Sequence, residues 1–269
     1  MAERIRVIVT GALGKMGSET VKAVINDEEL DLAAMVDVKA NGESLADIAG
    51  LKGTETNNLK VENDLDAVLA RIKPDIMIDF TNPQAVFSNA KTALEKQVTC
   101  VIGTTGMNDL ELKQLEKLAN DNQVGVAVIP NFAIGAVLMM KFAKEAAHYF
   151  PDVEIIELHH DQKMDAPSGT AIKTAQMITE NRAYQPPANA REFEKIPGSR
   201  GGNLDQVHIH SVRLPGLIAH QEVIFGGMGQ GLKIRHDSYN RVGFMQGVLM
   251  VVKKMIGRQG LVYGMDNLL

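Results

Sequence analysis

Apolar positions in the first half of the chain alternate between short β-branched runs and longer stretches with helical spacing. The short runs predict five buried strands, at residues 5–9, 30–36, 75–80, 98–102 and 123–129. Helical spacing predicts the helices between them, at residues 18–27, 64–72, 81–97 and 109–122. Residues 40 to 70 are less clear, although the helical spacing at 64–72 begins within them. This order is typical of an α/β fold with a doubly wound parallel sheet and helices on both faces.

The pattern changes after Pro130. A long apolar helix is predicted at residues 134–149, a strand at 153–158 and a Pro-, Gly- and charge-rich surface loop at 181–203. Three antiparallel strands and a last helix should follow, at residues 206–214, 217–225, 232–236 and 242–256. We therefore expect a second, α+β domain with a mainly antiparallel sheet at 131–239, inserted between a first domain at 1–130 and a C-terminal segment, about 240–269, that rejoins it.

Composition narrows the class of partner. Hydrophobic residues make up 45% of the 269 positions, and the net charge of -5 offers no broad basic surface for nucleic acid. Cys100 is the only cysteine, which excludes an intrachain disulfide and a cysteine-rich zinc site and is typical of a reducing compartment. No apolar run approaches the roughly twenty residues that span a bilayer, and the N-terminus does not read as a signal peptide. We expect a cytoplasmic protein that binds a small molecule, neither nucleic acid nor membrane.

Three glycines between the first strand and the first helix indicate a Rossmann-type dinucleotide site. Gly11, Gly14 and Gly17 are spaced for a tight turn, for close approach of the backbone to a pyrophosphate, and for close packing of helix on strand. Asp37 ends the second strand, where a carboxylate can bind an adenosine ribose. It would repel a 2'-phosphate, whereas Lys39 could attract one, so we expect use of NADH with NADPH tolerated. The alternative interpretation of these residues is a glycine-rich turn and a surface aspartate that bind no dinucleotide.

A second cluster of reactive side chains lies at residues 157–171. His159, His160 and Lys163 follow the predicted strand at 153–158 and can exchange protons near neutral pH or hold a carboxylate. Ser168 suits a helix N-cap, and Gly169 and Thr170 would let an anion approach the free N–H groups of the helix that follows. The segment therefore predicts an active site for an anionic substrate.

Two other interpretations of the histidines are weaker. Adjacent residues of a strand point to opposite faces, and the segment lacks the i, i+4 histidine pair of zinc peptidases, so we expect no metal. A single histidine would most often be structural. The neighbouring lysine and the predicted anion site favour a functional role here.

The segment from Glu157 through Lys163 and on to Ala171 resembles the signature of 4-hydroxy-tetrahydrodipicolinate reductases, enzymes of lysine and diaminopimelate biosynthesis. Further matches follow in family order, at residues 11–17, 80–81, 101–106, 131–135 and 266–269. The resemblance therefore covers essentially the whole chain. It implies reduction of 4-hydroxy-tetrahydrodipicolinate to tetrahydrodipicolinate with NADH or NADPH, in a homotetramer joined through the sheet of the second domain.

The resemblance also implies roles for individual residues. His159 would be the acid-base residue and Lys163 the proton donor, while the substrate's carboxylates would be held by His160, Lys163, Ser168, Gly169 and Thr170. The residues implied to contact the cofactor are Gly11, Ala12, Leu13, Gly14, Lys15, Met16, Asp37, Gly103, Thr104, Thr105, Ile129, Pro130, Asn131 and Phe132. The chain departs from many relatives at Val38, where they have an arginine that meets a 2'-phosphate, which leaves Lys39 as the nearest cation.

The mechanism that we expect begins with loss of the 4-hydroxyl of a cyclic dicarboxylate. A hydride then passes from the nicotinamide C4 to its imine-type carbon, between the two domains, with a proton from Lys163 or His159. Two rival functions use the same first domain. A semialdehyde dehydrogenase needs a thiol nucleophile, but Cys100 lies inside a predicted strand. A non-enzymatic redox sensor would give no reason for a histidine-lysine pair beside an anion site.

Overall fold

The computed structural model describes residues 4–49, 59–187 and 193–269. The chain divides into two compact units, one made of Met1–Phe132 with Phe244–Leu269 and the other of Ala133–Gly243. Each is described by itself. In the part of the chain that the structure describes, no helix is both long and apolar enough to cross a membrane.

The first unit contains a parallel sheet in the order β12-β6-β5-β4-β1-β2-β3. Every adjacent pair in this sheet runs parallel. Its strands are β1 (Ile5–Thr10), β2 (Leu30–Val36), β3 (Val61–Glu62), β4 (Ile76–Asp79), β5 (Thr99–Ile102), β6 (Gly125–Val128) and β12 (Gly260–Tyr263). The strand order reverses at this point, because β2 and β3 lie on one side of β1 whereas β4, β5 and β6 lie on the other. In such folds ligands bind at the carboxyl ends of the two strands where the order reverses, here β1 and β4.

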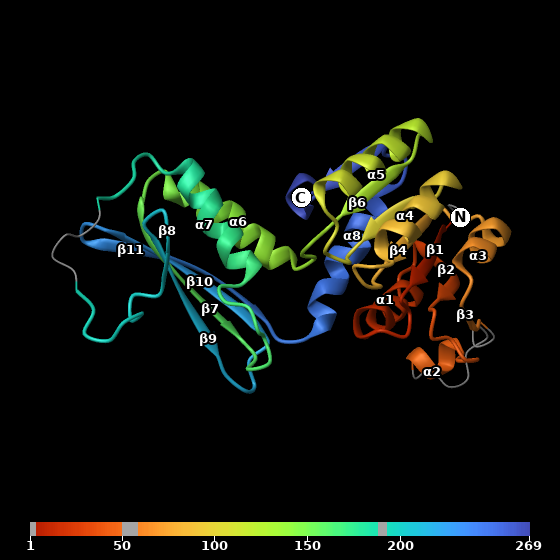
Figure 1. Ribbon diagram of the computed structural model, residues 1–269, viewed down its shortest axis with the longest axis horizontal. Helices are drawn as coiled ribbons and strands as arrows, with labels where there is room; N and C mark the ends of the chain where they lie inside the picture. The colour runs from red at the N-terminus through yellow and green to blue at the C-terminus, as the bar shows by residue number, and fades with distance from the viewer. Residues whose placement is uncertain (1–3, 50–58, 188–192) are drawn as a thin grey trace. The chain divides into compact units, whose positions relative to one another are not determined.

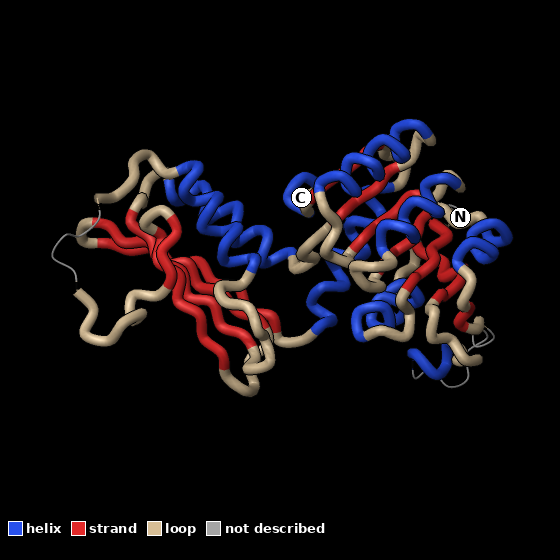
Figure 2. Tube along the Cα trace, in the orientation of Figure 1, coloured by secondary structure: helices blue, strands red, loops and turns tan. Residues whose placement is uncertain are grey.

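Helices cover both faces of this sheet (Figures 1 and 2). On one face α1 packs beside α8, and on the other α4 lies between α3 and α5. The helices of this unit are α1 (Lys15–Ile25), α2 (Leu45–Ala49), α3 (Leu65–Ile72), α4 (Val86–Glu95), α5 (Asp109–Asp121) and α8 (Met245–Met255). The strands read as nearly continuous apolar runs because both of their faces are buried.

Local sequence signals explain where these helices begin. Asp64 caps α3 by accepting a hydrogen bond from the amide of Ala67, and Asn108 with Glu111 forms a capping box on α5. The helix predicted at residues 81–97 begins later than expected, at Val86, as α4. The side chain of Asn82 accepts from the amides of Gln84 and Ala85, so the residues before α4 form a turn.

The second unit is built on a mixed sheet in the order β11-β10-β7-β9-β8. Its strands are β7 (Asp152–His159), β8 (Gly202–Leu204), β9 (Val207–Arg213), β10 (Ala219–Gly227) and β11 (Gln230–Ser238). Helices α6 (Ile134–Ala147) and α7 (Gly169–Asn181) pack side by side on one face of this sheet. Inward residues such as Ile155, Val223 and Phe225 fill the core beneath them.

The predicted class of this sheet is confirmed, but one expected pairing is wrong. β10 pairs antiparallel with β11 and with β7, whereas β9 pairs parallel with β7. The turn at Pro215-Gly216 is therefore a connection that passes β7 and not a hairpin. β7 carries apolar residues on both faces, including Ile155 and Ile156, which is typical of a central strand. β8 lies where the sequence predicted loop, in a stretch whose residues 188–192 are outside the described range.

Candidate active site

The glycine run that connects β1 to α1 has two positions that only glycine fits. Gly11 has φ +75°, and a Cβ atom there would lie 2.3 Å from the carbonyl oxygen of Phe80. A Cβ at Gly17 would lie 2.0 Å from the carbonyl oxygen of Gly11, so the first turn of α1 packs directly on the loop. Gly14 is the N-cap and provides no side-chain acceptor, which leaves the first N–H groups of α1 suited to an anion.

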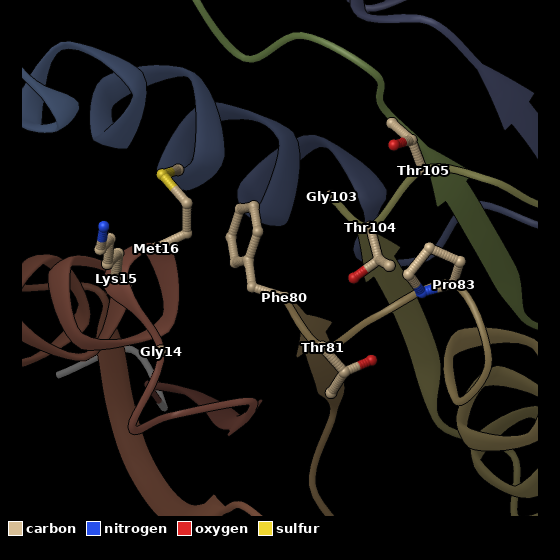
Figure 3. Close-up of a pocket in the computed structure, with 9 residues that line it drawn as sticks. All are labelled: Gly14, Lys15, Met16, Phe80, Thr81, Pro83, Gly103, Thr104 and Thr105. Carbon is tan, nitrogen blue, oxygen red and sulfur yellow. The ribbon is translucent and has the colours of Figure 1, made fainter. Parts of the chain in front are cut away.

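A cavity of about 480 Å³ lies beside the start of α1. Figure 3 shows the Phe80 ring in this cavity, between Met16 on one side and Thr104 on the other. The ring packs on the backbone of Gly103, where a Cβ would lie 2.0 Å from Phe80 Cε1. The lining residues are Gly14, Lys15, Met16, Phe80, Thr81, Pro83, Gly103, Thr104 and Thr105.

Six of these nine lining residues were predicted to contact the cofactor, whereas Phe80, Thr81 and Pro83 were not. All nine lie in the loops that follow β1, β4 or β5 or in the first turn of α1, near the carboxyl ends of these strands. A planar ring, three threonine side chains and one lysine around a cavity of this size suit a nucleotide-like ligand.

Asp37 connects the glycine run to the end of β2. Its Oδ2 accepts from the amide of Leu13 at 3.1 Å, and its Oδ1 accepts from the amide of Lys39 at 2.9 Å. The carboxylate thus fixes the backbone on both sides of the predicted ribose site. Val38, which follows Asp37, is 81% exposed, and Lys39 is exposed beside it.

Asp79 is a site residue that the sequence reasoning missed. It ends β4 and is fully buried, yet its carboxylate accepts hydrogen bonds from five donors. Oδ1 accepts from the amide and hydroxyl of Thr81 and from Thr104 Oγ1 at 2.7 Å, and Oδ2 accepts from Thr10 Oγ1 and Asn89 Nδ2. The residue therefore holds two threonines of the cavity wall in place. An aspartate that ends a buried strand was the available signal.

Asp79→Asn is expected to lower the free energy of unfolding by about 2 kcal/mol, because an amide nitrogen cannot accept the hydrogen bonds that one carboxylate oxygen now accepts. Denaturant unfolding of the two proteins measures the difference. Asp75→Asn is the matched control at the start of the same strand segment, since Asp75 is exposed and an asparagine oxygen can still accept its bond from the amide of Arg6. Equal losses in both variants would contradict the role given to Asp79.

Residues 129–132 follow β6, and one of them, Phe132, contacts the lining of the cavity. Ile129 and Phe132 are buried, Pro130 is exposed and Asn131 is half-buried. The Phe132 ring contacts that of Phe80, with their centroids 5.7 Å apart. These contacts place Phe132 behind the residue that lines the cavity and not in the lining itself.

In the second unit, a buried carboxylate holds one of the two predicted histidines. Glu157 Oε2 lies 2.5 Å from His159 Nδ1, and the Glu157 side chain is fully buried. Arg213 of β9 donates to both carboxylate oxygens, at 2.8 and 2.9 Å. Burial alone would raise the pKa of Glu157, but hydrogen bonds from His159, Arg213 and Ser211 outweigh it and lower that pKa to about 2.

The start of α7 lies against the same carboxylate. The amide of Ser168 donates to Glu157 Oε1 at 3.2 Å, and Ser168 Oγ accepts from the amide of Ala171, as the predicted N-cap requires. Nothing lies within 4 Å of the position that a Cβ at Gly169 would take, so the helix terminus is open there. The fold thereby brings His159 and the predicted anion site together.

Lys163 lies in the loop between β7 and α7. Its Nζ contacts both oxygens of Asp165, at 2.7 and 2.8 Å, and its amide donates to the carbonyl oxygen of His160. The hydrogen bond from Lys163 holds the pKa of the Asp165 carboxyl below its usual range. His160 is exposed at the end of β7, and Thr170 is half-buried in the first turn of α7.

Comparison with known proteins shows the family. Residues 5–132 match the family described as "Dihydrodipicolinate reductase, N-terminus", and residues 135–269 match "Dihydrodipicolinate reductase, C-terminus". The chain is 70% identical over 269 residues to a 4-hydroxy-tetrahydrodipicolinate reductase of Syntrophomonas wolfei subsp. wolfei, with all of both chains covered. It is 50% identical over 268 residues to the enzyme of Desulfitobacterium hafniense, with 99% of each chain covered.

Solved structures agree with this assignment. A dipicolinate-bound dihydrodipicolinate reductase from Paenisporosarcina sp. TG-14 is 50% identical, with a TM-score of 0.88 over 99% of this chain and 100% of that one. An aspartate semialdehyde dehydrogenase II from Vibrio cholerae shares only the fold, with a TM-score of 0.55 and 10% identity over 93% of this chain and 98% of that one.

The semialdehyde dehydrogenase hypothesis fails on Cys100, which is fully buried in β5 and whose pKa burial raises, so the thiol is not a nucleophile. Both halves of the chain match one family of reductases over nearly their whole length. The chain therefore belongs to the dihydrodipicolinate reductase family and is an oxidoreductase of lysine and diaminopimelate biosynthesis.

Proposed function

We propose that this enzyme reduces 4-hydroxy-tetrahydrodipicolinate to tetrahydrodipicolinate with NADH or NADPH, and that His159 and Lys163 transfer the protons. The observation that carries the proposal is the contact of His159 with the buried Glu157 beside the N-terminus of α7. It joins an acid-base group to a site for a carboxylate within one unit. Lys163 adds a cation that can both bind and donate a proton.

The first unit has the features that a nicotinamide dinucleotide requires. Gly11 allows the tight turn, Gly14 leaves the first N–H groups of α1 open to a pyrophosphate, and Gly17 allows α1 to pack on the loop. Asp37 is placed at the end of β2 for a ribose, and the cavity beside Phe80 has room for a planar ring. When bound, the reduced nicotinamide supplies the hydride.

The second unit would provide the protons. Because the ionised Glu157 accepts a hydrogen bond from His159 Nδ1, the neutral ring keeps its proton on that atom and Nε2 remains to exchange one with the substrate. Lys163 Nζ, now paired with Asp165, would exchange this partner for a substrate carboxylate. The 4-hydroxyl of the substrate leaves as water before the hydride arrives, and the two residues then neutralise the negative charge that develops as the carbon is reduced.

The substrate's carboxylates would bind at the start of α7. The first N–H groups of the helix, the open backbone at Gly169, and the side chains of Thr170 and His160 suit an anion there. The Paenisporosarcina relative supports this choice, since dipicolinate is a planar ring with two carboxylates. A dicarboxylate is therefore the substrate class that we assign to this site.

The proposal is tested by mixing the purified enzyme with reduced nicotinamide cofactor and the condensation product of pyruvate and aspartate semialdehyde. Loss of the absorbance of the reduced nicotinamide is expected, with formation of tetrahydrodipicolinate. Binding of the cofactor without its oxidation would instead support the redox-sensor alternative.

Lys39 should affect the two cofactors differently. Lys39→Ala is expected to raise KM for NADPH about fivefold and to leave KM for NADH nearly unchanged, because an exposed lysine contributes at most about 1 kcal/mol to binding a 2'-phosphate. Paired steady-state kinetics measure both constants. Lys60→Ala is a control for loss of one exposed positive charge in the same unit. An equal change in KM for both cofactors would show that Lys39 does not contact the 2'-phosphate of NADPH.

Assembly into a homotetramer is supported by the open face of the second unit's sheet. Both helices of this unit in the described ranges cover the other face, while Ile156, Leu158 and Ile224 lie half-buried on the open one. Apolar side chains on an uncovered sheet face are typical of a contact between subunits. Sedimentation velocity should give the mass of a tetramer, and a monomer at micromolar concentration would exclude this assembly.

A further inference from the structure

We propose that Glu157 and Arg213 form a positioning pair that fixes the ring orientation and tautomer of His159 during the reaction. This inference rests on the proposed function, since it assigns His159 the proton transfer. Neither residue was a predicted site residue, and neither is given contact with the substrate or the cofactor here. Their role would be exerted through the imidazole ring.

The position of Glu157 in the sheet is the first argument. It lies two residues before His159 on β7, so both side chains project from the same face of the strand, toward α7. The other inward residues of this strand, Val153 and Ile155, are apolar core residues. A carboxylate in such a row is unfavourable unless every oxygen is hydrogen-bonded, so its presence calls for a specific partner.

The hydrogen bonds of this carboxylate are the second argument. Oε1 accepts from Arg213 and from the amide of Ser168, and Oε2 accepts from Arg213 and faces His159 Nδ1 at 2.5 Å. The two arginine contacts form the bidentate geometry that holds a carboxylate in one plane. Glu157 therefore has one fixed orientation, and it presents one oxygen to the histidine.

Arg213 extends this geometry to the lysine. Arg213 on β9 is the register partner of His159 on β7, so the two residues lie side by side on neighbouring strands. It also donates to the carbonyl oxygen of Asp165 at 2.7 Å, and the Asp165 side chain holds Lys163. One guanidinium thus links the strand that carries His159 to the loop that carries Lys163.

The ionisation of Glu157 supplies the chemical consequence. With its pKa near 2, the carboxylate remains charged at every pH at which the enzyme would work. A charged carboxylate can only accept, so it keeps the proton of the neutral ring on Nδ1. An amide in its place could present either a donor or an acceptor and would no longer define the tautomer, as for the buried carboxylate of a catalytic triad.

Glu157→Gln tests the proposal, with Glu154→Gln as the matched control. Glu154 lies on the same strand and also contacts a histidine and an arginine, His210 and Arg200, but on the opposite side of the strand. We expect Glu157→Gln to lower kcat about a hundredfold, to leave KM for the reduced cofactor unchanged, and to move the alkaline limb of the pH profile of kcat to lower pH. Glu154→Gln should leave kcat and its pH profile as in the unmodified enzyme.

Arg213→Lys provides the graded variant, because a lysine keeps the charge and loses the bidentate geometry. We expect kcat to fall about tenfold, between the unmodified enzyme and Glu157→Gln. Circular dichroism and sedimentation establish that each variant is folded and assembled. A folded Glu157→Gln enzyme with unchanged kcat and pH profile would overturn the proposal.

Nitrogen NMR of histidine-labelled, unmodified enzyme reports the tautomer of His159 directly. This measurement needs neither turnover nor a stable Glu157→Gln variant. At alkaline pH the His159 signal, identified by its loss in His159→Gln, should show a proton on Nδ1. A proton on Nε2 would overturn the proposal. Failure of the proposed function is separate, because it would appear as absence of turnover in the unmodified enzyme while the Nδ1 signature was retained.

Discussion

The double variant His159→Ala, Lys163→Ala is expected to reduce kcat by at least about a thousandfold, because one positioned acid or base contributes a factor of about 10² to 10⁴ and both are removed. Each single variant should lose nearly as much as the pair, since residues that act on one proton transfer are not additive. KM for the reduced cofactor should change little, because neither residue belongs to the unit that holds the glycine run. Steady-state kinetics with saturating cofactor measure both constants.

His148→Ala, Lys173→Ala is the matched control for that experiment. It removes the same two residue types from the same unit, at exposed positions at the end of α6 and on α7. Its turnover should equal that of the unmodified enzyme. Intact turnover in the His159, Lys163 double variant would refute the assignment of both residues.

The variant Gly17→Ala should be destabilised by about 3 kcal/mol and should bind the reduced cofactor too weakly to detect at ordinary concentrations. In an open helix this substitution would stabilise, because alanine is the better helix former by up to about 1 kcal/mol. Here the added Cβ would lie 2.0 Å from the carbonyl oxygen of Gly11, so either α1 or the glycine run must move. Denaturant unfolding and cofactor titration measure the two effects.

Gly243→Ala serves as the control for Gly17→Ala. No atom lies within 4 Å of the position that its Cβ would take, and its φ is not positive. Its free energy of unfolding should stay within about 0.5 kcal/mol of the unmodified enzyme. If Gly17→Ala bound the cofactor normally, the close packing of α1 on the loop would have no functional role.

Elements with strong periodicity were predicted nearly to the residue. β2 has the predicted bounds, and α3, α5 and α7 begin after caps that the sequence displays. Pairing of strands was less predictable. The alternation along β9 indicates which of its side chains are buried. It does not indicate that β9 pairs with β7 instead of β10, the next strand along the chain. The short strands β3 and β8 have two and three residues, too few for a period to appear.

The candidate site shows the same limit. The glycine run and the segment from His159 to Thr170 are local in the sequence, so their spacing carried the prediction. Asp79 and Arg213 act through partners 25 and 56 residues away, Thr104 and Glu157. No local pattern reports such contacts, because they depend on which strands become neighbours. The one feature that the sequence shows for both Asp79 and Glu157 is an acidic residue near the end of an apolar, strand-like run.

The last strand of the first unit has a consequence for synthesis of the chain on the ribosome. β12 pairs with β6, so Gly125–Val128 gains its outer neighbour only after residue 263 has been added. The 131 residues between Val128 and Gly260 must therefore be made while this edge of the parallel sheet is open to wrong partners. The second unit, residues 133–243, lies within these 131 residues and can form its own core before β12 is synthesised.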